Sequence, residues 1–238
     1  MNPQPTSTAP IYISEGELAD KLRLAMQRVY LWMTVGLMLT AGVAFVVVNS
    51  PLLFVAANPV VFIGAAIVEL ILVVVLSRRV ATMAPASAVG LFFVYAALNG
   101  VTMSLIFAIY TAGSIVMTFV ATACLFGAMT IIGYTTQRDL TRLGGFLLMG
   151  LIGLVIGSVI NLFFASTMLY WIVTYVGIAV FIGLTAYNTQ RVKNLTLLAL
   201  QQGDTLVEQR VGIQGALSLY LDFVNLFLLL LRLAGRRR

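Results

Sequence analysis

The stretch that decides the fold is residues 213–232, IQGALSLYLDFVNLFLLLLR. As a helix it has the length of one bilayer crossing, which takes about 20 mostly apolar residues. At about 100° per residue, five polar side chains fall within a stripe of about 80° on one face. A lipid-facing helix does not tolerate such a stripe, so we expect a helix buried among others. Its stripe then either faces an aqueous path or joins helices by hydrogen bonds. This polar stripe consists of Gln214, Ser218, Asp222, Asn225 and Arg232.

The composition of the whole chain indicates a membrane protein. Of 238 residues, 61% are hydrophobic and 9% are charged, and the mean hydropathy is +1.04. Soluble domains carry about 25% charged residues, so a water-soluble enzyme is excluded. The chain has no His and one Cys, Cys124, which excludes a three-ligand zinc site, a Ser/His/Asp triad and an intramolecular disulfide. We therefore expect no enzyme activity and no cofactor. The net charge of +6 suits basic loops beside apolar spans and does not indicate nucleic-acid binding.

The apolar runs predict an all-α integral membrane protein with seven spans. Gly, Pro, Asn and Ser residues separate the runs, as expected of helix ends. We expect residues 1–24 to form a disordered cytoplasmic tail. The first apolar run is too long for a signal peptide, so we expect it to be the first span of a single transmembrane domain of residues 25–238. The predicted spans are 29–48, 60–76, 87–109, 115–134, 144–165, 171–187 and 213–231.

The positive residues of the loops predict the orientation. Ten Lys and Arg residues flank the spans on the side of the N-terminus, and the alternate loops 49–59, 110–114 and 166–170 contain none. Because positive loops stay in the cytoplasm, we expect a cytoplasmic N-terminus, in a bacterial plasma membrane. Seven crossings would place Arg236, Arg237 and Arg238 outside, against the rule, so the last segment either crosses regardless or re-enters.

Two acidic side chains lie inside predicted spans, Glu69 and Asp222. Ionisable groups at this depth are costly and mark ion or proton pathways by default. The alternative is a structural carboxylate that is paired with Arg or hydrogen-bonded in the bundle. On the sixth span Thr174, Thr185 and Asn188 share one face, and we expect Asn188 to lie at a depth similar to that of Asp222.

Several strings resemble the Bax inhibitor-1 family, also called the transmembrane Bax inhibitor motif family. They are AYNTQ at 186–190, ALSLYLDFVN at 216–225, YTTQRDL at 134–140 and ALNGVTMS at 97–104. The resemblance runs from about residue 25 to the C-terminus. It implies a seven-helix fold in which the C-terminal helix is central and wrapped by the other six.

The resemblance also implies a calcium leak controlled by pH, in which acidic residues of the sixth and seventh spans share a proton. Asp222 matches the seventh-span member of that pair, and Glu69 resembles the second-span acid. Arg232 resembles the arginine that pairs with that second-span acid, and Arg78 or Arg79 resembles a cytoplasmic latch. The departure is Asn188, which stands where the family usually carries Asp. An amide binds no proton at physiological pH, so we expect pH sensing by this pair to be weakened or displaced.

The leading hypothesis is therefore a leak pathway for Ca²⁺, with weak, transient coordination by Asp222 and Glu69 and with the bilayer, Ca²⁺ and H⁺ as partners. An alternative is a regulatory membrane protein that binds and modulates a membrane protease or another partner through tail 1–20 and loop 188–210. A proton-coupled transporter would also use Asp222. An intramembrane hydrolase is disfavoured because no second acid pairs with Asp222.

Overall fold

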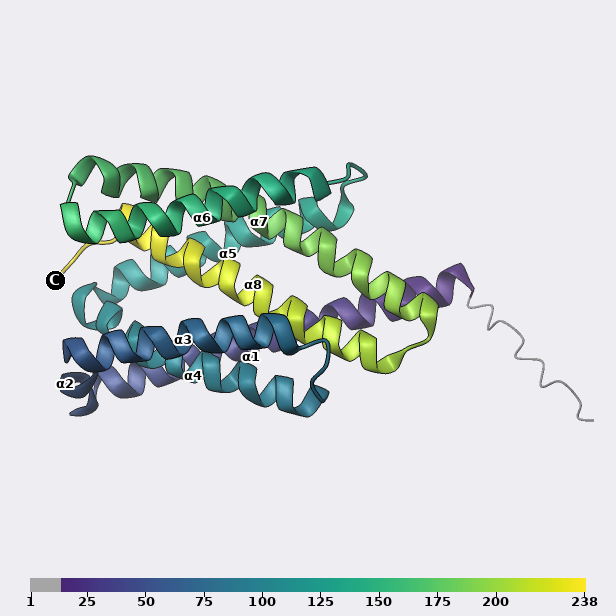
Figure 1. The fold of residues 1–238 in the computed structure, drawn as a ribbon, viewed down its shortest axis with the longest axis horizontal. Coiled ribbons are helices and arrows are strands. Elements are labelled where there is room, and N and C mark those ends of the chain that lie inside the picture. The colour runs from purple at the N-terminus through teal and green to yellow at the C-terminus, as the bar shows by residue number, and fades with distance from the viewer. Residues whose placement is uncertain (1–13) are drawn as a thin grey trace, which may run out of the picture.

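The computed structural model describes residues 14–238 and consists of helices joined by short turns (Figure 1). Seven of these helices are long and apolar enough to cross a bilayer. The elements are α1 (Glu15–Val48), α2 (Leu52–Ala56), α3 (Pro59–Arg79), α4 (Pro85–Ile109), α5 (Ala112–Thr135), α6 (Thr141–Phe164), α7 (Thr167–Gln202) and α8 (Thr205–Ala234).

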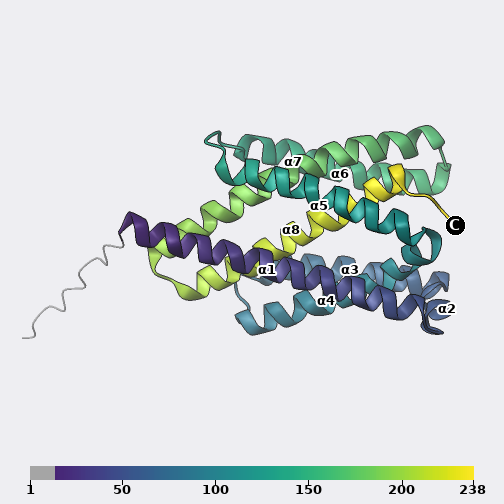
Figure 2. The ribbon, with the colours of Figure 1, turned by 180° about the vertical axis from the view of Figure 1, so that it is seen from behind.

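The helices form two groups with α8 between them. Helices α1 to α4 pack together on one side and α5 to α7 on the other, and α8 runs obliquely between the groups in both views (Figures 1 and 2). The main partners of α8 are α1, α4, α5 and α7. In its most apolar window 61% of the residues are buried, against none in that of α6. A buried last helix is thus observed, but enclosure by all six others is not confirmed, because α3 packs mainly on α4 and α6 mainly on α7.

Aromatic side chains and two hydroxyl groups join α1, α4 and α8 in the core. Tyr220 is fully buried and makes edge-to-face contacts with Phe92 and Tyr95. Its hydroxyl is 2.7 Å from Thr40 Oγ1, which also lies 2.8 Å from the carbonyl oxygen of Ala96. A buried tyrosine hydroxyl needs such a partner, so this contact fixes the rotation of α8 relative to α1.

The helix α1 begins earlier than the predicted tail allows. Residues 15–24 are helical, whereas residues 1–13 of that predicted tail lie outside the described part of the chain. The Ser14 side chain accepts a hydrogen bond from the Glu17 amide, and Glu17 forms an i,i+4 ion pair with Lys21 at 2.8 Å. Leu22 and its neighbours on that face are buried, so packing extends the helix beyond the apolar run.

The predicted loop 188–210 is also largely helical. Helix α7 continues to Gln202 and α8 starts at Thr205, and the resulting hairpin projects past the neighbouring loops together with the start of α1 (Figure 1). Gly203 adopts a left-handed conformation with φ 68° and ends α7, and the Asp204 side chain accepts amide hydrogen bonds from the first turn of α8. Capping therefore converts a loop predicted from its polarity into a tight helical turn.

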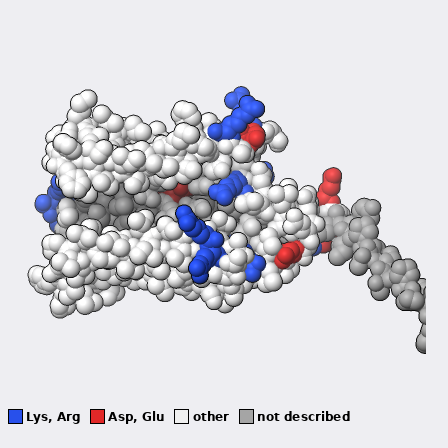
Figure 3. All heavy atoms as spheres, viewed as in Figure 1, with Lys and Arg blue, Asp and Glu red and all other residues white. Residues whose placement is uncertain are grey.

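Most of the Lys and Arg residues gather at two ends of the molecule (Figure 3). One end, called the cation-rich end, carries the start of α1, the turns 80–84 and 136–140 and the α7–α8 turn. At the opposite end lies the C-terminus, where the Arg236 amide donates to Ser114 Oγ at 2.8 Å and the Arg238 amide donates to the Ile109 carbonyl at 2.9 Å. The last helix therefore runs from one end of the bundle to the other. Of the two alternatives given for this segment, crossing and re-entry, the structure has the crossing helix.

Helices α5 and α7 approach closely at Gly133. A Cβ atom at this residue would collide with the Ala186 backbone, whereas one at Gly127 on the same helix would meet no atom within 4 Å. We predict that Gly133→Ala forces the helices apart and destabilises the protein by about 1–3 kcal/mol. Its melting temperature in detergent should fall. The control Gly127→Ala should be neutral or stabilising, because Ala favours helix. Equal melting of both variants would contradict this packing.

Candidate functional site

The α7–α8 hairpin brings Asn188 and Asp222 together. The Asn188 amide nitrogen donates a hydrogen bond to Asp222 Oδ2 at 2.7 Å. Asp222 is 3% exposed, and Asn188 is half-buried. The two residues thus lie at a similar height in the bundle, as expected from the sequence. A buried carboxylate requires hydrogen-bond donors, and here an uncharged amide supplies one.

Two hollows flank this pair along α8. Toward the cation-rich end a small hollow, with room for about one water molecule, is lined by Asn188, Arg191, Gln214 and Ser218 among others. Toward the opposite end a hollow of about 550 Å³ reaches Asn225, three residues past Asp222. The members of the polar stripe therefore line two separate spaces, and the Asn188–Asp222 pair lies between them.

Glu69 belongs to a different polar group, on α3 and α4. Thr102 Oγ1 donates to Glu69 Oε1 at 2.8 Å, and Asn99 Nδ2 lies 3.5 Å from Glu69 Oε2. The Glu69 side chain is half-buried, and its hydrogen-bond partners are distinct from that of Asp222. This is the arrangement expected of a carboxylate that joins two helices. The structure therefore does not bring the two intramembrane acids to one site.

The cations that the resemblance associates with these acids lie elsewhere. The Arg232 guanidinium carbon stands 5.0 Å from the centre of the Tyr170 ring, and no ion pair within residues 14–238 joins Arg232 to Glu69. The expected pairing of these two residues is therefore wrong for this conformation. Arg78 and Arg79 are exposed at the last turn of α3, where positive charge favours the helix dipole. In the described residues neither forms an ion pair, so their role as a latch stays a prediction.

The structure joins two of the strings on which the resemblance rests. Gln190, the last residue of AYNTQ, accepts a hydrogen bond from the Leu140 amide at 2.8 Å and donates to the Arg138 carbonyl at 2.9 Å. Arg138 and Leu140 belong to YTTQRDL. Nearby, Lys193 Nζ donates to the Tyr134 carbonyl at 2.7 Å. Sequence reasoning overlooked Gln190, since a buried amide that serves two backbone groups has no spacing signature.

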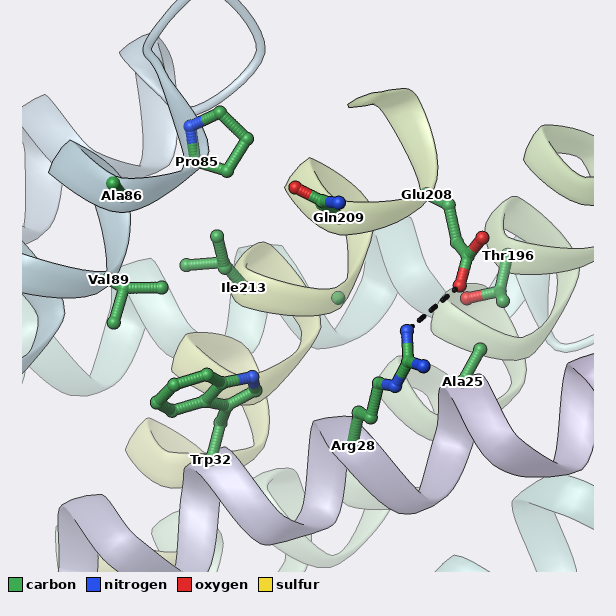
Figure 4. A pocket seen from close by; sticks show the side chains of 11 residues that line it. Ala25, Arg28, Trp32, Pro85, Ala86, Val89, Thr196, Glu208, Gln209 and Ile213 are labelled. Atoms are coloured by element: carbon green, nitrogen blue, oxygen red, sulfur yellow. Dashed lines mark ion pairs between the residues drawn. The ribbon is translucent and has the colours of Figure 1, made fainter. Parts of the chain in front are cut away.

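A pocket at the cation-rich end lies between α1, α4 and α8 (Figure 4). Arg28 and Glu208 face each other across it with 3.8 Å between Nη1 and Oε1, and the Trp32 ring is part of its lining (Figure 4). A second contact holds the start of α8, since Arg210 Nε donates to the Met83 carbonyl at 3.0 Å. These contacts attach the hairpin to α1 and to the α3–α4 turn. An ion pair this long and exposed contributes little stability.

Comparison with known proteins identifies relatives along almost the whole chain. The profile of the family described as "Inhibitor of apoptosis-promoting Bax1" matches residues 22–238. The chain is 50% identical over 221 residues to inner membrane protein YbhL of Escherichia coli K12, covering 91% of this chain and 93% of the relative. It is also 39% identical to an uncharacterized protein of Borreliella burgdorferi over 90% of this chain and 92% of that one. An uncharacterized protein of Deinococcus radiodurans is 37% identical over 97% and 98%.

The Asn188–Asp222 hydrogen bond predicts a stability difference. Asn188→Ala removes the donor and leaves a buried carboxylate oxygen unsatisfied, which costs about 1–3 kcal/mol. We expect a lower melting temperature for purified Asn188→Ala in detergent. The matched control is Gln214→Ala, on the same polar stripe but with no side-chain hydrogen bond to any residue of 14–238, and it should melt with the parent protein. If the two variants melted together, the hydrogen bond would not contribute.

The Gln190 contacts predict local protection of the α5–α6 turn. In Gln190→Leu the Leu140 amide loses its acceptor while the apolar packing volume is kept. We expect faster hydrogen exchange in a peptide covering 136–141, measured by mass spectrometry, with α3 unchanged. Gln201→Leu, at an exposed position of the same helix, is the control. Unchanged exchange in the Gln190 variant would show that the turn is held by other contacts.

Proposed function

The chain belongs to the Bax inhibitor-1 family of multi-pass membrane proteins, and we propose that it is a Ca²⁺ leak channel of a bacterial inner membrane. The observation that carries the proposal is a buried carboxylate, Asp222, between two hollows on the polar stripe of a buried helix. The membrane assignment is supported by the name of the relative from Escherichia coli. The N-terminus is cytoplasmic, in accord with the ten cations of the cation-rich end.

The path follows the polar stripe of α8. A cation enters beside Gln214 and Ser218, passes Asp222 and leaves beside Asn225. The Asn225 amide nitrogen donates to the Leu221 carbonyl, so its side-chain oxygen remains available as a ligand. Together with Asp222 and Ser218 it offers the oxygen atoms that Ca²⁺ prefers. One carboxylate among neutral oxygens binds weakly, which permits an ion to leave again.

In the present conformation this path is closed. Asp222 is sealed from both hollows and hydrogen-bonded to Asn188. The hollow on either side is lined by an arginine, Arg191 toward the cation-rich end and Arg232 toward the other. These charges oppose the entry of cations, which favours a slow leak over rapid conduction. Opening then requires the Asn188–Asp222 hydrogen bond to break so that the carboxylate can bind the ion.

Glu69 contributes to this proposal in a different way from Asp222. Its hydrogen bonds to Thr102 and Asn99 hold α3 on α4, beside the core that contains Tyr95 and Tyr220. We assign it a structural role in the closed state, with weak Ca²⁺ coordination only after α3 and α4 separate. Arg78 and Arg79 remain candidates for a cytoplasmic latch, since they stand beside the α3–α4 turn to which Arg210 is bonded.

The test is Ca²⁺ influx into dye-loaded liposomes containing the purified chain, from pH 6 to 8. We expect flux above that of empty liposomes with a weak pH dependence. Asn188→Asp places two carboxylates in contact, and because such a pair titrates as a unit, the pH dependence should become steeper. Asp222→Asn should alter the flux at every pH. No flux from any of the three proteins would refute the channel.

A second candidate function is regulation of a membrane partner, such as a protease. The observation that favours it is the projecting α7–α8 hairpin with its exposed residues 201–206 (Figure 1). A regulator needs no ion path, so the purified chain alone would be inactive in the liposome assay. The two functions are therefore separated by the same measurement.

A further inference from the structure

The hollow of about 550 Å³ at the end opposite the cation-rich end has the features of a binding site. It lies between α6, α7 and α8 and is called the α6–α8 slot below. Ligand sites usually combine a volume of about 300–1,000 Å³ with apolar walls and a few polar groups. The floor of the slot consists of the buried side chains Leu154, Val173, Phe181 and Leu229. Its polar groups are Ser158, Asn161, Tyr170, Asn225 and Arg232.

The polar groups of the slot have unused bonding capacity. Arg232 lies over the Tyr170 ring, and within residues 14–238 it has no acidic partner. A guanidinium carries five N–H donors and binds carboxylate or phosphate in a planar geometry. The side-chain oxygen of Asn161 is buried and has no hydrogen-bond partner in the described residues. It is an acceptor for a hydroxyl group. The slot therefore matches an acidic group that carries neighbouring hydroxyls.

The apolar part of the slot extends along α7. Tyr170 and Phe181 both line it and are eleven residues apart on α7, which is about 16 Å along a helix. A small hydrophilic anion would leave this apolar floor uncovered. An acyl chain along the helices would cover it and place its head group beside Arg232.

The bilayer supplies molecules of this kind directly to the slot. The outer face of α6 is lipid-exposed in character, with Leu162 and Phe163 each 82% exposed. Tyr170, Trp171 and Arg232 lie at the same end of the bundle, where aromatic and cationic side chains meet lipid head groups. A lipid can therefore enter from the side and keep its head at the interface.

We propose that the α6–α8 slot binds a membrane lipid with a net negative head group, with an acyl chain in the slot and the acidic group on Arg232. This assigns Arg232 a role that does not involve Glu69. The slot ends at Asn225, close to Asp222, so a bound chain covers this pair on one side. The binding itself does not depend on whether the protein conducts ions.

The experiment is native mass spectrometry of the full-length protein in detergent, titrated with phosphatidylglycerol or phosphatidylcholine of the same acyl chains. We expect phosphatidylglycerol to bind more tightly, by about fivefold for one arginine at the membrane surface. Arg232→Gln should abolish this preference. Arg142→Gln, an exposed cation at the cation-rich end, should retain it. Equal binding of the two lipids to the parent protein would overturn the proposal, as would equal effects of the two variants.

A second variant tests the acyl chain separately. Ser158→Phe places a ring in the slot from an exposed position of α6, and it should weaken the binding of phosphatidylglycerol. Val176→Phe, exposed on α7 and outside the slot, is the matched control. Glycerol 3-phosphate, which lacks the acyl chains, should fail to compete. Full competition by glycerol 3-phosphate, or unchanged lipid binding by Ser158→Phe, would show that the site binds the head group alone. Either result would refute the proposal that an acyl chain lies in the slot.

Discussion

The bilayer core offers no water to a polar group, and this constraint organises the bundle around Asp222. A carboxylate in that environment must find its hydrogen bonds inside the protein. Asn188 supplies one, which requires α7 and α8 to be neighbours in a fixed register. The remaining faces of α8 are apolar and are covered by α1, α4 and α5. One buried carboxyl group thus sets the register of α7 and α8, on which α1, α4 and α5 pack, while α3 and α6 can remain mostly exposed to lipid.

That register depends on structure at the cation-rich end, outside the apolar spans. Gly203 and Asp204 make a turn short enough to keep α7 and α8 antiparallel and adjacent. Gln190, two residues from Asn188, binds the α5–α6 turn through two backbone groups. The contacts of Gln190 therefore hold in place the segment of α7 that carries Asn188.

The sequence predicted the spans well because the apolar runs are long and their ends carry Gly, Pro and Asn. It also predicted that Asn188 and Asp222 lie at a similar depth, since the rise along each helix can be counted from the ends of the two spans. It failed where packing outweighs polarity, as in the early start of α1 and the helical hairpin at Gly203. The pairing of Arg232 with Glu69, which the resemblance implied, is not found in this conformation within residues 14–238, because a matching motif gives no distance between side chains. Only the structure shows that these side chains bond to different neighbours.

Asn188 removes the pH dependence of the hydrogen bond within the buried pair. In the acidic pair that the family resemblance implies, one carboxyl group can donate a hydrogen bond to the other only while it holds a proton. An amide donates the same bond at every pH, because its two N–H donors are permanent. The 2.7 Å hydrogen bond between Asn188 and Asp222 therefore takes the place of the hydrogen bond that two carboxyl groups form when they share one proton. Unlike that bond, it does not require either side chain to bind a proton. The pair keeps one titratable group, Asp222, and loses the mutual repulsion that would couple two of them. In the channel proposed above, closure is consequently set by packing and hydrogen bonding around one carboxyl group rather than by exchange of a shared proton.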